Sequence, residues 1–582
     1  MSIDDLYARF DDQRGSFELR RATRVLAAYN LSDVVPTLDA VEVAVGEGLW
    51  CAGFVAYEAG PAFDPALAAH PPVEGLPLVW FGAFTERVPT IAPAGREYDV
   101  YRWYPNISER TFSESIDRIK SYIAQGDSYQ VNHTFRLRSE FRGDPLGLYA
   151  DLVTAQRGDY SAFLDIGSHQ IASASPELFF HWRQGRIEVK PMKGTTRRGR
   201  WSEEDRERAA WLRSSEKDRA ENLMIVDLLR NDVGKLARVG TVTAAPLFEL
   251  ERYETVWQLT STIRAELRSN TRLRDVFTGL FPSGSITGAP KARTTEIIDE
   301  LELDPRGVYC GAIGLVSPSD EGLDAEFNVA IRTVTIDAAT SIAEFGVGGG
   351  ITWDSTSAGE YQEALWKTAV LDGVKRDFGL FETLRWDHEY LFLDRHLNRL
   401  CSSAAYFGFP CSRPDLEMAL KSVSRELTAP TRVRLELAPD GGVLATASGA
   451  LPRFATSIQD ADEVTVEFAG TPVQPHDRML FHKTTDRTTY DLAMSEVTSQ
   501  EALLTNAYGE ITESTISNVV LLLDGIWFTP PLESGCLPGV YRQHLLEQGQ
   551  IVERVLRRED LLSSEMIGLV NSVRGWRRAL LA

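Results

Sequence analysis

The chain has 582 residues, a formal net charge of -22, 43% hydrophobic residues and 25% charged residues. Single hydrophobic cores stop growing near ~250 to 300 residues, so this length predicts two or more domains, and the composition excludes a disordered chain. The strong negative charge argues against nonspecific binding to nucleic acid or anionic lipid, although a local group of Arg and Lys side chains still suits a small anionic substrate.

The cysteines are few, odd in number and scattered, and their spacing indicates no metal site. They are Cys51, Cys310, Cys401, Cys411 and Cys536. Residues 1–21 are polar and acidic and lack the apolar core of a signal peptide, and no apolar run approaches the ~18 residues of a membrane span. We therefore expect a reduced, cytoplasmic protein.

Taken in chain order, the first part of the sequence alternates strand and helix patterns. Alternating apolar residues predict strands at 49–57, 171–182, 187–192 and 308–317. Helical periodicity is clearest at 113–125, 202–229, 292–302 and 358–374. The mixture predicts an α+β domain whose helices lie outside large β-sheets.

A second domain is predicted to begin after Lys375. Segments 378–385 and 389–392 are typical of a hairpin, and a helix is predicted at 394–407. Strands at 432–437 and 464–468 complete a smaller α/β unit. We therefore expect domains at residues 1–372 and 376–582, with 1–94 as a divergent part of the first.

Two neighbouring strands of the first domain are predicted to end at chemically useful residues. Glu177 follows one strand, and Lys193, succeeded by Gly194 and Thr195, ends the next one sixteen residues later. A partly desolvated lysine has a lowered pKa and a nucleophilic amine. The spacing alone fits a solvated lysine at a turn better than it fits a nucleophile.

Carboxylates recur at helical spacing in this domain. Asp218 and Glu221 lie three residues apart, as do Glu360 and Glu363, so each pair shares a helix face. Such pairs suit Mg²⁺, which takes one or two protein carboxylates and fills its other positions with water and substrate. Each pair alone also fits an exposed helix face.

Loops of small residues lie between the two carboxylate pairs. Segments 281–291 and 346–351 are rich in Gly and Ser, and the first leads into a predicted helix. Backbone N–H groups in such loops can approach an anion closely, and a helix N-terminus favours negative charge. Neither segment matches the P-loop or the dinucleotide fingerprint, which argues against nucleotide binding.

Together these motifs resemble the chorismate-utilising enzymes, a family that includes anthranilate, aminodeoxychorismate, isochorismate and salicylate synthases. The resemblance covers about residues 95–370, and segments 126–132 and 217–232 also carry it. It implies the family's fold of large β-sheets with outer helices, chorismate as substrate, and Mg²⁺ bound by Glu221 and Glu363 with support from Asp218 and Glu360.

Within that family, Lys193 resembles the lysine of aminodeoxychorismate synthase component I, where anthranilate synthases usually have alanine. The resemblance implies that Lys193 attacks C2 of chorismate and expels the 4-hydroxyl, after which ammonia adds at C4 and displaces the lysine. Glu177 matches an acid/base carboxylate. The implied substrate-binding positions are Gly194, Thr195, Thr287, Tyr309, Arg332, Gly346, Gly348 and Gly349.

The sequence departs from many of these relatives at Gln258, where they have histidine. If that histidine is an acid in the anthranilate branch, its replacement weakens an anthranilate interpretation of this chain. The amination interpretation is unaffected, but the source of a proton at this position stays open.

The second domain contains the groups that pyridoxal phosphate requires, namely a lysine, a carboxylate near the pyridine nitrogen and a phosphate cradle. Taken singly, these residues also fit turns, caps and a surface lysine. In order, they resemble the fold type IV pyridoxal-phosphate enzymes over about residues 376–582, a two-subdomain α/β fold. The resemblance implies that Lys483 forms the Schiff base and Glu513 pairs with the ring nitrogen. The implied phosphate ligands are Arg399, Ser517, Asn518 and the amides of Val540 and Tyr541.

The two resemblances together imply that chorismate and ammonia become 4-amino-4-deoxychorismate, from which pyruvate is eliminated to give 4-aminobenzoate for folate or a specialised metabolite. Segment 571–576 resembles a C-terminal segment of such lyases, although the cofactor motifs alone do not separate lyase from aminotransferase. The alternative is an anthranilate synthase component fused to a D-amino acid aminotransferase-like domain.

Three expectations about partners follow. No cysteine lies in a Gly-x-Cys-x-Gly elbow, so we expect a separate glutamine amidotransferase subunit as ammonia donor. The fold type IV resemblance implies a possible homodimer through the second domain. We expect neither nucleic acid nor membrane as a partner.

Overall fold

The computed structural model describes residues 3–12, 15–91, 93, 96–156, 158–320, 322–372 and 378–582. The chain forms two compact units. Unit 1 comprises Met1–Arg198 and Arg208–Val374, and unit 2 comprises Gly199–Glu207 and Lys375–Ala582. Among the residues just given, no helix is long and apolar enough to cross a membrane.

The described part of unit 1 is dominated by an 18-stranded sheet. Its strands are β1 (Tyr7–Asp12), β2 (Gly15–Ala28), β3 (Trp50–Val55), β4 (Val79–Thr90), β5 (Tyr98–Val100), β6 (Tyr104–Pro105), β7 (Gln130–Gly143), β8 (Tyr160–Asp165), β9 (His169–Ser175), β10 (Leu178–Arg183), β11 (Arg186–Lys190), β13 (Thr243–Ala244), β16 (Ile263–Glu266), β17 (Gly288–Ala289), β18 (Ala312–Ser319), β19 (Gly322–Val329), β20 (Thr333–Asp337) and β21 (Ile342–Ile351).

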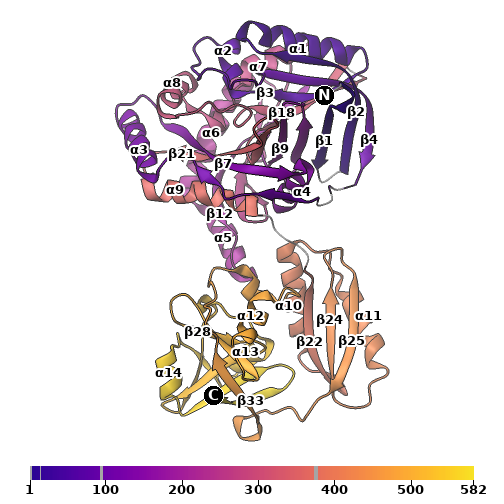
Figure 1. Cartoon of the computed structure of the whole chain (residues 1–582), viewed down its shortest axis with the longest axis vertical. Helices are drawn as coiled ribbons and strands as arrows, with labels where there is room; N and C mark the ends of the chain where they lie inside the picture. The colour runs from indigo at the N-terminus through magenta and orange to yellow at the C-terminus, as the bar shows by residue number, and fades with distance from the viewer. Residues whose placement is uncertain are drawn as a thin grey trace. The chain divides into compact units, whose positions relative to one another are not determined.

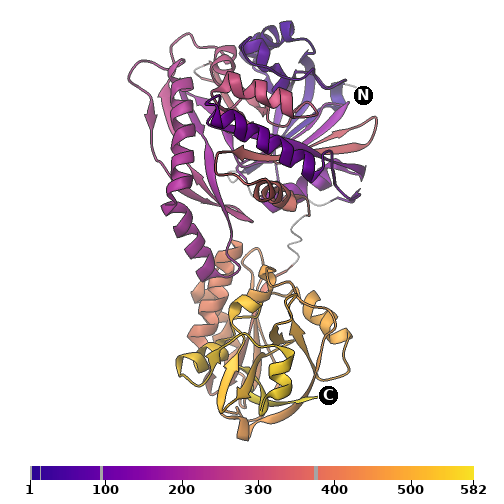
Figure 2. The same ribbon diagram turned by 90° about the vertical axis from the view of Figure 1, so that its left-hand side faces the viewer.

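Helices cover this sheet on its outer sides (Figure 1). They are α1 (Leu31–Gly46), α2 (Gly60–Phe63), α3 (Glu109–Ala124), α4 (Pro145–Gln156), α7 (Leu273–Leu280), α8 (Lys291–Leu301) and α9 (Ser357–Trp366). Helix α1 packs on β2, β3, β4 and β18, whereas α3, α8 and α9 gather over β7 and β21 (Figure 2). Two large apolar clusters fill the spaces beneath these two groups of helices. The predicted α+β class is confirmed.

A long antiparallel pairing between β7 and β21 forms one wall of the future site. Its register places Gly346 opposite Arg136 and Gly350 opposite Asn132. Strand β17 pairs with the start of β7, so the loop around residue 287 is fixed beside it. The small-residue segment 346–350 is therefore a strand, not the loop that the sequence suggested.

A separate three-stranded sheet, β12 (Met192–Arg197), β15 (Val256–Thr260) and β14 (Glu249–Arg252), carries Lys193. The single helix predicted at 202–229 is wrong, because two helices occur, α5 (Ser202–Ser214) and α6 (Glu216–Gly234). The break lies at Ser215, whose side chain caps α6 by accepting from the Asp218 N–H. Ser is a preferred N-cap, and this residue starts a new helix within one continuous apolar pattern.

Two other predicted elements are each two elements in the structure, one divided at a proline and one at a helix end. The strand predicted at 171–182 is β9 and β10, which separate at Pro176 and Glu177. The helix predicted at 358–374 is α9 followed by a 3-10 turn, Lys367–Asp372. The last two residues of that prediction, and the predicted domain boundary after 372, lie outside the described residues.

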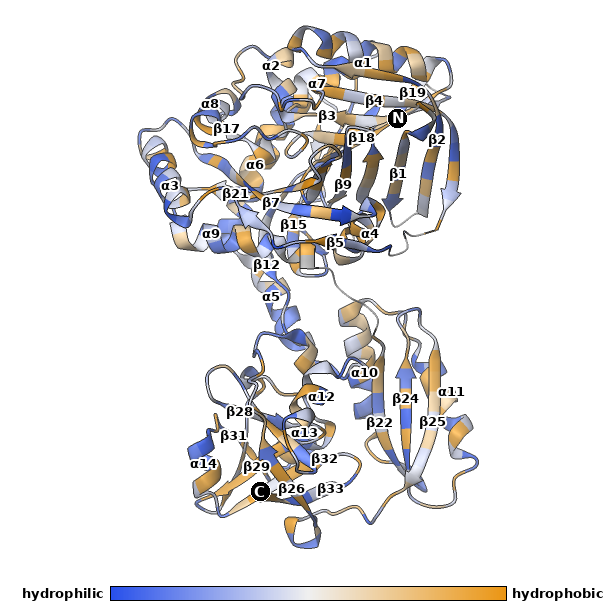
Figure 3. Cartoon of the chain, viewed as in Figure 1, coloured by the Kyte–Doolittle hydropathy of each residue, from blue (hydrophilic) through white to orange (hydrophobic). Residues whose placement is uncertain are grey.

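Unit 2 contains two sheets. The first is four-stranded, with β22 (Leu380–Asp387), β23 (Glu389–Tyr390), β24 (Thr431–Leu437) and β25 (Val443–Ala450). Helices α10 (Leu393–Phe407) and α11 (Arg413–Ser424) pack on it. Hydrophilic and hydrophobic residues alternate along β24 (Figure 3), so one face of this sheet is apolar core and the other is polar.

The second sheet of unit 2 has eight strands and mixed directions. They are β26 (Asp462–Phe468), β27 (Glu501–Thr505), β28 (Ile511–Ser514), β29 (Asn518–Leu523), β30 (Ile526–Thr529), β31 (Val552–Glu553), β32 (Met566–Asn571) and β33 (Gly575–Leu581). Helices α12 (Thr488–Ser495), α13 (Val540–Glu547) and α14 (Arg558–Ser563) accompany it. The predicted two-subdomain α/β architecture is confirmed.

Candidate active sites

Unit 1 contains a cavity of about 430 Å³ that collects nearly all of the residues predicted for its site. The predicted residues that line it are Glu177, Lys193, Gly194, Thr195, Asp218, Glu221, Tyr309, Arg332, Gly346, Gly348, Gly349, Glu360 and Glu363. They come from the large sheet, the three-stranded sheet and helices α6 and α9, and Glu177, Tyr309 and Arg332 come from connections between strands of the large sheet. The fold thus brings together segments that are more than a hundred residues apart in sequence.

Lys193 projects into this cavity from β12. Burial lowers the pKa of its amine, and the nearby Glu221 carboxylate opposes that shift. A Cβ atom added at Gly350 would lie 2.8 Å from Lys193 Nζ, so the glycine strand leaves the room that this side chain occupies. The lowered pKa makes this confined amine easier to deprotonate than that of an exposed lysine, as a nucleophile requires.

The backbone of Lys193 is tied to helix α6 through Asn222, which is 1% exposed. The Asn222 Nδ2 group donates to Lys193 O at 3.2 Å and to Leu259 O at 3.1 Å, and its Oδ1 accepts from Ser261 Oγ at 2.6 Å. This one side chain therefore joins β12 and β15 to the helix that carries Asp218 and Glu221.

Glu177 lies at the β9–β10 break and is 3% exposed. Burial raises the pKa of its carboxyl to about 7, although a hydrogen bond from Ser285 and the charge of Lys193 oppose the shift. A carboxyl that titrates near neutrality can both donate and accept a proton at physiological pH.

Four carboxylates line the floor of the same cavity, and lysines pair with two of them. Lys367 Nζ lies 2.9 Å from Glu363 Oε1 and donates to Gly348 O at 2.8 Å, while Lys217 Nζ lies 3.9 Å from Glu221 Oε1. Glu360 accepts from Ser355 Oγ at 2.6 Å.

Within the described ranges, no three of these carboxylates, nor any other three His, Cys, Asp or Glu side chains, converge closely enough to hold a metal ion. Burial nevertheless raises the pKa values of Glu221 and Glu360. Oxygen donors whose charge is disfavoured by burial suit a hard cation such as Mg²⁺. The donor set therefore fits Mg²⁺ chemically. In this structure Lys217 pairs with Glu221 and Lys367 pairs with Glu363.

Other residues of the cavity wall suit an anion. Burial lowers the pKa of Arg332 to about 10, and its guanidinium donates to Lys367 O. Tyr309 is 8% exposed and lies beneath Arg136, whose Cζ is 5.0 Å from the ring centroid. A Cβ atom at Gly346 would lie 2.3 Å from the Tyr309 ring, so only glycine leaves this ring in place.

Thr287 does not line the cavity. It is fully buried, its hydroxyl donates to Ser283 O at 3.0 Å, and its carbonyl accepts from the Asn132 N–H at 2.8 Å. Gln258 does line it, and its Oε1 accepts from Thr195 Oγ1 at 3.0 Å. Sequence reasoning missed Lys217 and Lys367, although each lies four residues from a predicted metal ligand.

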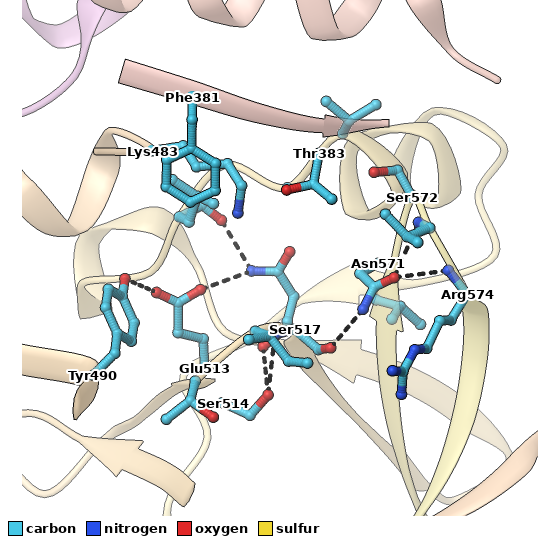
Figure 4. A pocket seen from close by; sticks show the side chains of 18 of the residues that line it. Phe381, Thr383, Lys483, Tyr490, Glu513, Ser514, Ser517, Asn571, Ser572 and Arg574 are labelled. Carbon is cyan, nitrogen blue, oxygen red and sulfur yellow. Dashed lines mark hydrogen bonds between the residues drawn. The ribbon is translucent and has the colours of Figure 1, made fainter. Parts of the chain in front are cut away.

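Unit 2 contains a second cavity of about 250 Å³ (Figure 4). The predicted residues that line it are Arg399, Lys483, Glu513, Ser517, Asn518 and Val540. Thr383, Arg432, Arg434, Tyr490 and Arg574 line it too. Of these, sequence reasoning did not single out Arg432, Arg434 or Tyr490. The cavity is bounded by the polar face of the four-stranded sheet and by β28, β29, β32 and the start of α13.

Lys483 enters this cavity with its Nζ 4.7 Å from the centroid of the Phe381 ring. Burial lowers the pKa of Lys483 to about 8, and the charge of Arg399 acts in the same direction. A lysine of this kind is partly unprotonated near neutral pH, which suits Schiff-base chemistry.

Glu513 lies across the cavity and is 4% exposed. Its Oε1 accepts from the Tyr490 hydroxyl at 2.7 Å, and its Oε2 faces the Asn518 amide at 3.5 Å (Figure 4). Burial raises the pKa of Glu513 to about 7, and the Tyr490 hydrogen bond opposes this. A positively charged pyridinium nitrogen nearby would lower the pKa of Glu513 and favour its ionised form, so this environment fits a carboxylate that pairs with a bound cation.

Arg399 is anchored by Glu382, to which it donates from Nε and Nη2 at 2.7 Å each. Burial of Glu382 opposes ionisation, but Arg399 and His396 together lower its pKa to about 2. Arg399 also donates to Pro538 O at 3.0 Å. This bidentate pair holds a cation at the edge of the cavity.

The remaining cradle residues surround the N-terminus of α13. Ser517 Oγ accepts from Asn571 Nδ2 at 3.0 Å and from Arg577 Nη2 at 2.6 Å. A Cβ atom at Gly539 would lie 1.9 Å from Asn518 Oδ1. Helix α13 can therefore start against Asn518 only because residue 539 is glycine. The set of a guanidinium, a hydroxyl and helix N–H groups fits a phosphate.

The Tyr541 side chain does not line the cavity. It packs between the Phe392 and Phe454 rings, with centroid distances of 5.7 Å and 5.2 Å. The prediction for this residue concerned its backbone amide, which lies in the first turn of α13.

Fold and sites together define a chain of two enzyme-type domains, one with a lysine and carboxylates in an anion-binding cavity and one with a buried lysine and a phosphate cradle. Comparison with known proteins places each domain. Residues 88–372 match the family of chorismate binding enzymes, and residues 379–581 match the class IV amino-transferases.

Individual relatives agree with the first assignment. The chain is 42% identical over 261 residues to aminodeoxychorismate synthase component 1 of Klebsiella aerogenes, which covers 45% of this chain and 57% of that protein. It is 37% identical over 276 residues to anthranilate synthase component 1 of Aquifex aeolicus, over 47% of this chain and 55% of that protein. The chain thus spans a little over half the length of these curated relatives.

A solved structure supports the fold of unit 1. Anthranilate synthase component I from Streptococcus pneumoniae superposes with a TM-score of 0.53 at 24% identity, over 64% of this chain and 93% of that one. At this identity the likeness supports the fold alone, and the chemistry has to be argued from the cavity.

Proposed function

We propose that the chain converts chorismate and ammonia to 4-amino-4-deoxychorismate in unit 1 and removes pyruvate from that product in unit 2, which yields 4-aminobenzoate. The observation that carries the proposal is the cavity of unit 1, where Lys193, Glu177 and four carboxylates face one another. The similarity to aminodeoxychorismate synthase component 1 supports it.

In unit 1, Lys193 Nζ would form a bond to C2 of chorismate while the ring double bonds shift and the C4–O bond breaks. Glu177, whose carboxyl still carries a proton near pH 7, would give that proton to the departing hydroxyl, which leaves as water. Ammonia then bonds to C4, the double bonds shift back, and the C2–N bond breaks to return Lys193. Ammonia loses one proton in this step, for which the Glu177 carboxylate is the acceptor in place.

Substrate binding would use two groups of residues in the cavity. Tyr309, Arg332 and the N–H groups of the Gly346–Gly349 strand would hold carboxylate, for which a guanidinium has the matching geometry. Glu221 and Glu363 would hold Mg²⁺, with Asp218 and Glu360 in support. The ion, when bound, would neutralise the ring carboxylate.

We retain Thr287 as a substrate-binding candidate only through its backbone. Its hydroxyl is engaged with Ser283, and the residue is buried. Contact with substrate would require this loop to move, whereas Gly194 and Thr195 already border the cavity.

In unit 2, pyridoxal phosphate would supply an electron sink when bound. Arg399, Ser517, Asn518 and the amides at Val540 and Tyr541 would hold its phosphate. Glu513 would face the pyridine nitrogen, and Lys483 would hold the cofactor and then move a proton from the amine-bearing carbon of the substrate. Loss of that proton and cleavage of the bond between the neighbouring ring carbon and the pyruvyl ether oxygen would make the ring aromatic and release pyruvate.

Lyase chemistry is preferred over transamination because unit 1 makes the lyase's substrate in the same chain. Ammonia would come from glutamine through a separate amidotransferase subunit. A homodimer through unit 2 is also proposed. The anthranilate alternative is weaker, because Lys193 and Gln258 both depart from that branch.

The test is a chromatographic assay of the purified chain with chorismate, Mg²⁺, ammonium at alkaline pH and pyridoxal phosphate. Equal amounts of 4-aminobenzoate and pyruvate support both steps, whereas anthranilate would overturn the assignment of unit 1. Lys193→Ala should stop the pathway, and Lys483→Ala should let aminodeoxychorismate accumulate. Lys235→Ala, at an exposed helix end, is the matched control and should change neither.

A further inference from the structure

Two of the scattered cysteines meet in unit 2. Cys401 lies in α10, Cys411 lies just before α11, and their sulfur atoms are 3.4 Å apart, with the Cys411 thiol donating to Cys401. Both residues are partly exposed. Nothing in their sequence spacing indicated a pair, because the contact depends on how the chain turns after the helix.

The turn that brings them together is well fixed. Helix α10 ends at Phe407, and Gly408 adopts the left-handed conformation with φ of 71°. The N–H groups of Gly408 and Phe409 both donate to Ala404 O. Phe407 and Phe409 also pack against Phe378, at 5.1 Å and 5.8 Å between centroids. The approach of the two thiols is therefore built into a capped and packed helix end.

The other three cysteines are in a different situation. Cys51, Cys310 and Cys536 are at most 1% exposed, and burial raises the pKa of each thiol. Reagents in solution therefore reach Cys401 and Cys411 far more readily than the rest.

We propose that Cys401 and Cys411 form a dithiol modification site that a peroxide oxidises to an intramolecular disulfide. One thiolate attacks a peroxide oxygen, the O–O bond breaks, and a sulfenic acid and water are formed from hydrogen peroxide. The second sulfur then bonds to the first and expels its hydroxyl as a second water. Two electrons pass from the sulfurs to the peroxide, and each thiol gives up one proton.

The geometric demand of this step is small. A disulfide has an S–S length of ~2.05 Å, so the sulfurs need to approach by about 1.4 Å, which side-chain rotation and a slight shift of the turn can supply. Burial and the neighbouring Cys401 sulfur raise the pKa of Cys411 to about 12. The reaction should therefore be slow at neutral pH and should accelerate as pH rises.

The disulfide would act on the helix that borders the cavity of unit 2. Arg399 precedes Cys401 by two residues, and Ser403, which follows it by two, shares a 2.9 Å hydrogen bond with His482 Nδ1, next to Lys483. Closing the loop between 401 and 411 would fix the last turns of α10 to the start of α11. A loop of this size should raise the Tm of unit 2 by roughly 5 °C.

The test uses the full chain, treated with hydrogen peroxide at pH 7 and pH 9 and then with a thiol-blocking reagent. Intact and peptide mass spectrometry should show the loss of two hydrogens in a linked 401–411 peptide, formed faster at pH 9 and reversed by dithiothreitol. Calorimetry should show the higher Tm only in the oxidised sample.

Two matched variants keep the outcome decisive. Cys401→Ser should give no linked peptide and no rise in Tm on oxidation, whereas Cys310→Ser should behave like the unmodified chain. Retention of both free thiols at pH 9, or separate sulfinic acids at 401 and 411 without a link, would overturn the proposal. Neither result depends on the reactions assigned to the two units.

Discussion

Replacing Gly346 by alanine tests the assignment of the anion-binding end of unit 1. The new Cβ would lie 2.3 Å from the Tyr309 ring, whereas carbon atoms pack at about 3.5 Å. The ring would therefore have to move by about 1.2 Å. It has little space, because Tyr309 is 8% exposed and the Arg136 guanidinium lies 5.0 Å from its centroid.

Overpacking of this kind costs roughly 1 to 3 kcal/mol. If Tyr309 holds substrate, the displaced ring should raise the KM for chorismate by roughly tenfold, measured as aminodeoxychorismate formation at saturating ammonium. The rate of 4-aminobenzoate formation from added aminodeoxychorismate should stay unchanged and serves as an internal control for unit 2.

Gly46→Ala is the matched control, since a Cβ there meets nothing within 4 Å. It should alter neither KM nor Tm. A KM for Gly346→Ala within twofold of the unmodified chain would refute the role given to Tyr309, and a fall in both activities would indicate general misfolding instead.

Three further predictions concern protonation and cofactors. Because the pKa of Glu177 is raised to about 7, its proton is present below pH 7 and lost above it, so turnover at saturating chorismate and a fixed concentration of free ammonia should decline as pH rises through 7. Glu177→Gln should remove that limb of the pH profile and lower kcat by roughly a hundredfold, and an unchanged limb would assign the acid elsewhere. Chelation of Mg²⁺ by EDTA should stop aminodeoxychorismate formation and spare the lyase step; loss of both would mean that the metal serves unit 2 as well. The 2.7 Å hydrogen bond from Tyr490 lowers the pKa of the Glu513 carboxyl. Tyr490→Phe removes this bond, so the Glu513 pKa should rise and kcat for pyruvate release should fall roughly three- to tenfold. An unaltered kcat with an unaltered cofactor absorbance spectrum would contradict the role of Glu513.

Much of the architecture follows from local patterns. Apolar periodicity located β3, α3, α8, α10 and β24 to within a few residues. It failed where one residue interrupts a continuous pattern, as Ser215 does by capping α6 and Pro176 does by ending β9. Such breaks depend on a single hydrogen bond or a fixed dihedral angle, which periodicity does not register.

The candidate sites were predictable as residue types and only partly as geometry. The resemblance supplied Lys193, Glu221 and Lys483, and all three line cavities. The i,i+4 spacing of Glu363 and Lys367 was a readable signal for their ion pair, whereas no pattern indicated that Thr287 turns its hydroxyl away from the cavity. The Thr287 outcome depends on which way a side chain points after packing, and sequence spacing contains no such information.

The strand from Gly346 to Gly350 has a consequence for how this enzyme can change over generations. An added methyl group at Gly346, Gly348 or Gly350 would meet an atom within 2.3 Å. At these three positions the main chain itself forms the wall, so any substitution adds a side chain that collides with a neighbouring atom, and few point mutations are tolerated there. Diversification of unit 1 is therefore channelled to the facing wall, where Lys193 and Gln258 stand, and laboratory evolution toward a different ring chemistry should find its productive substitutions at those positions.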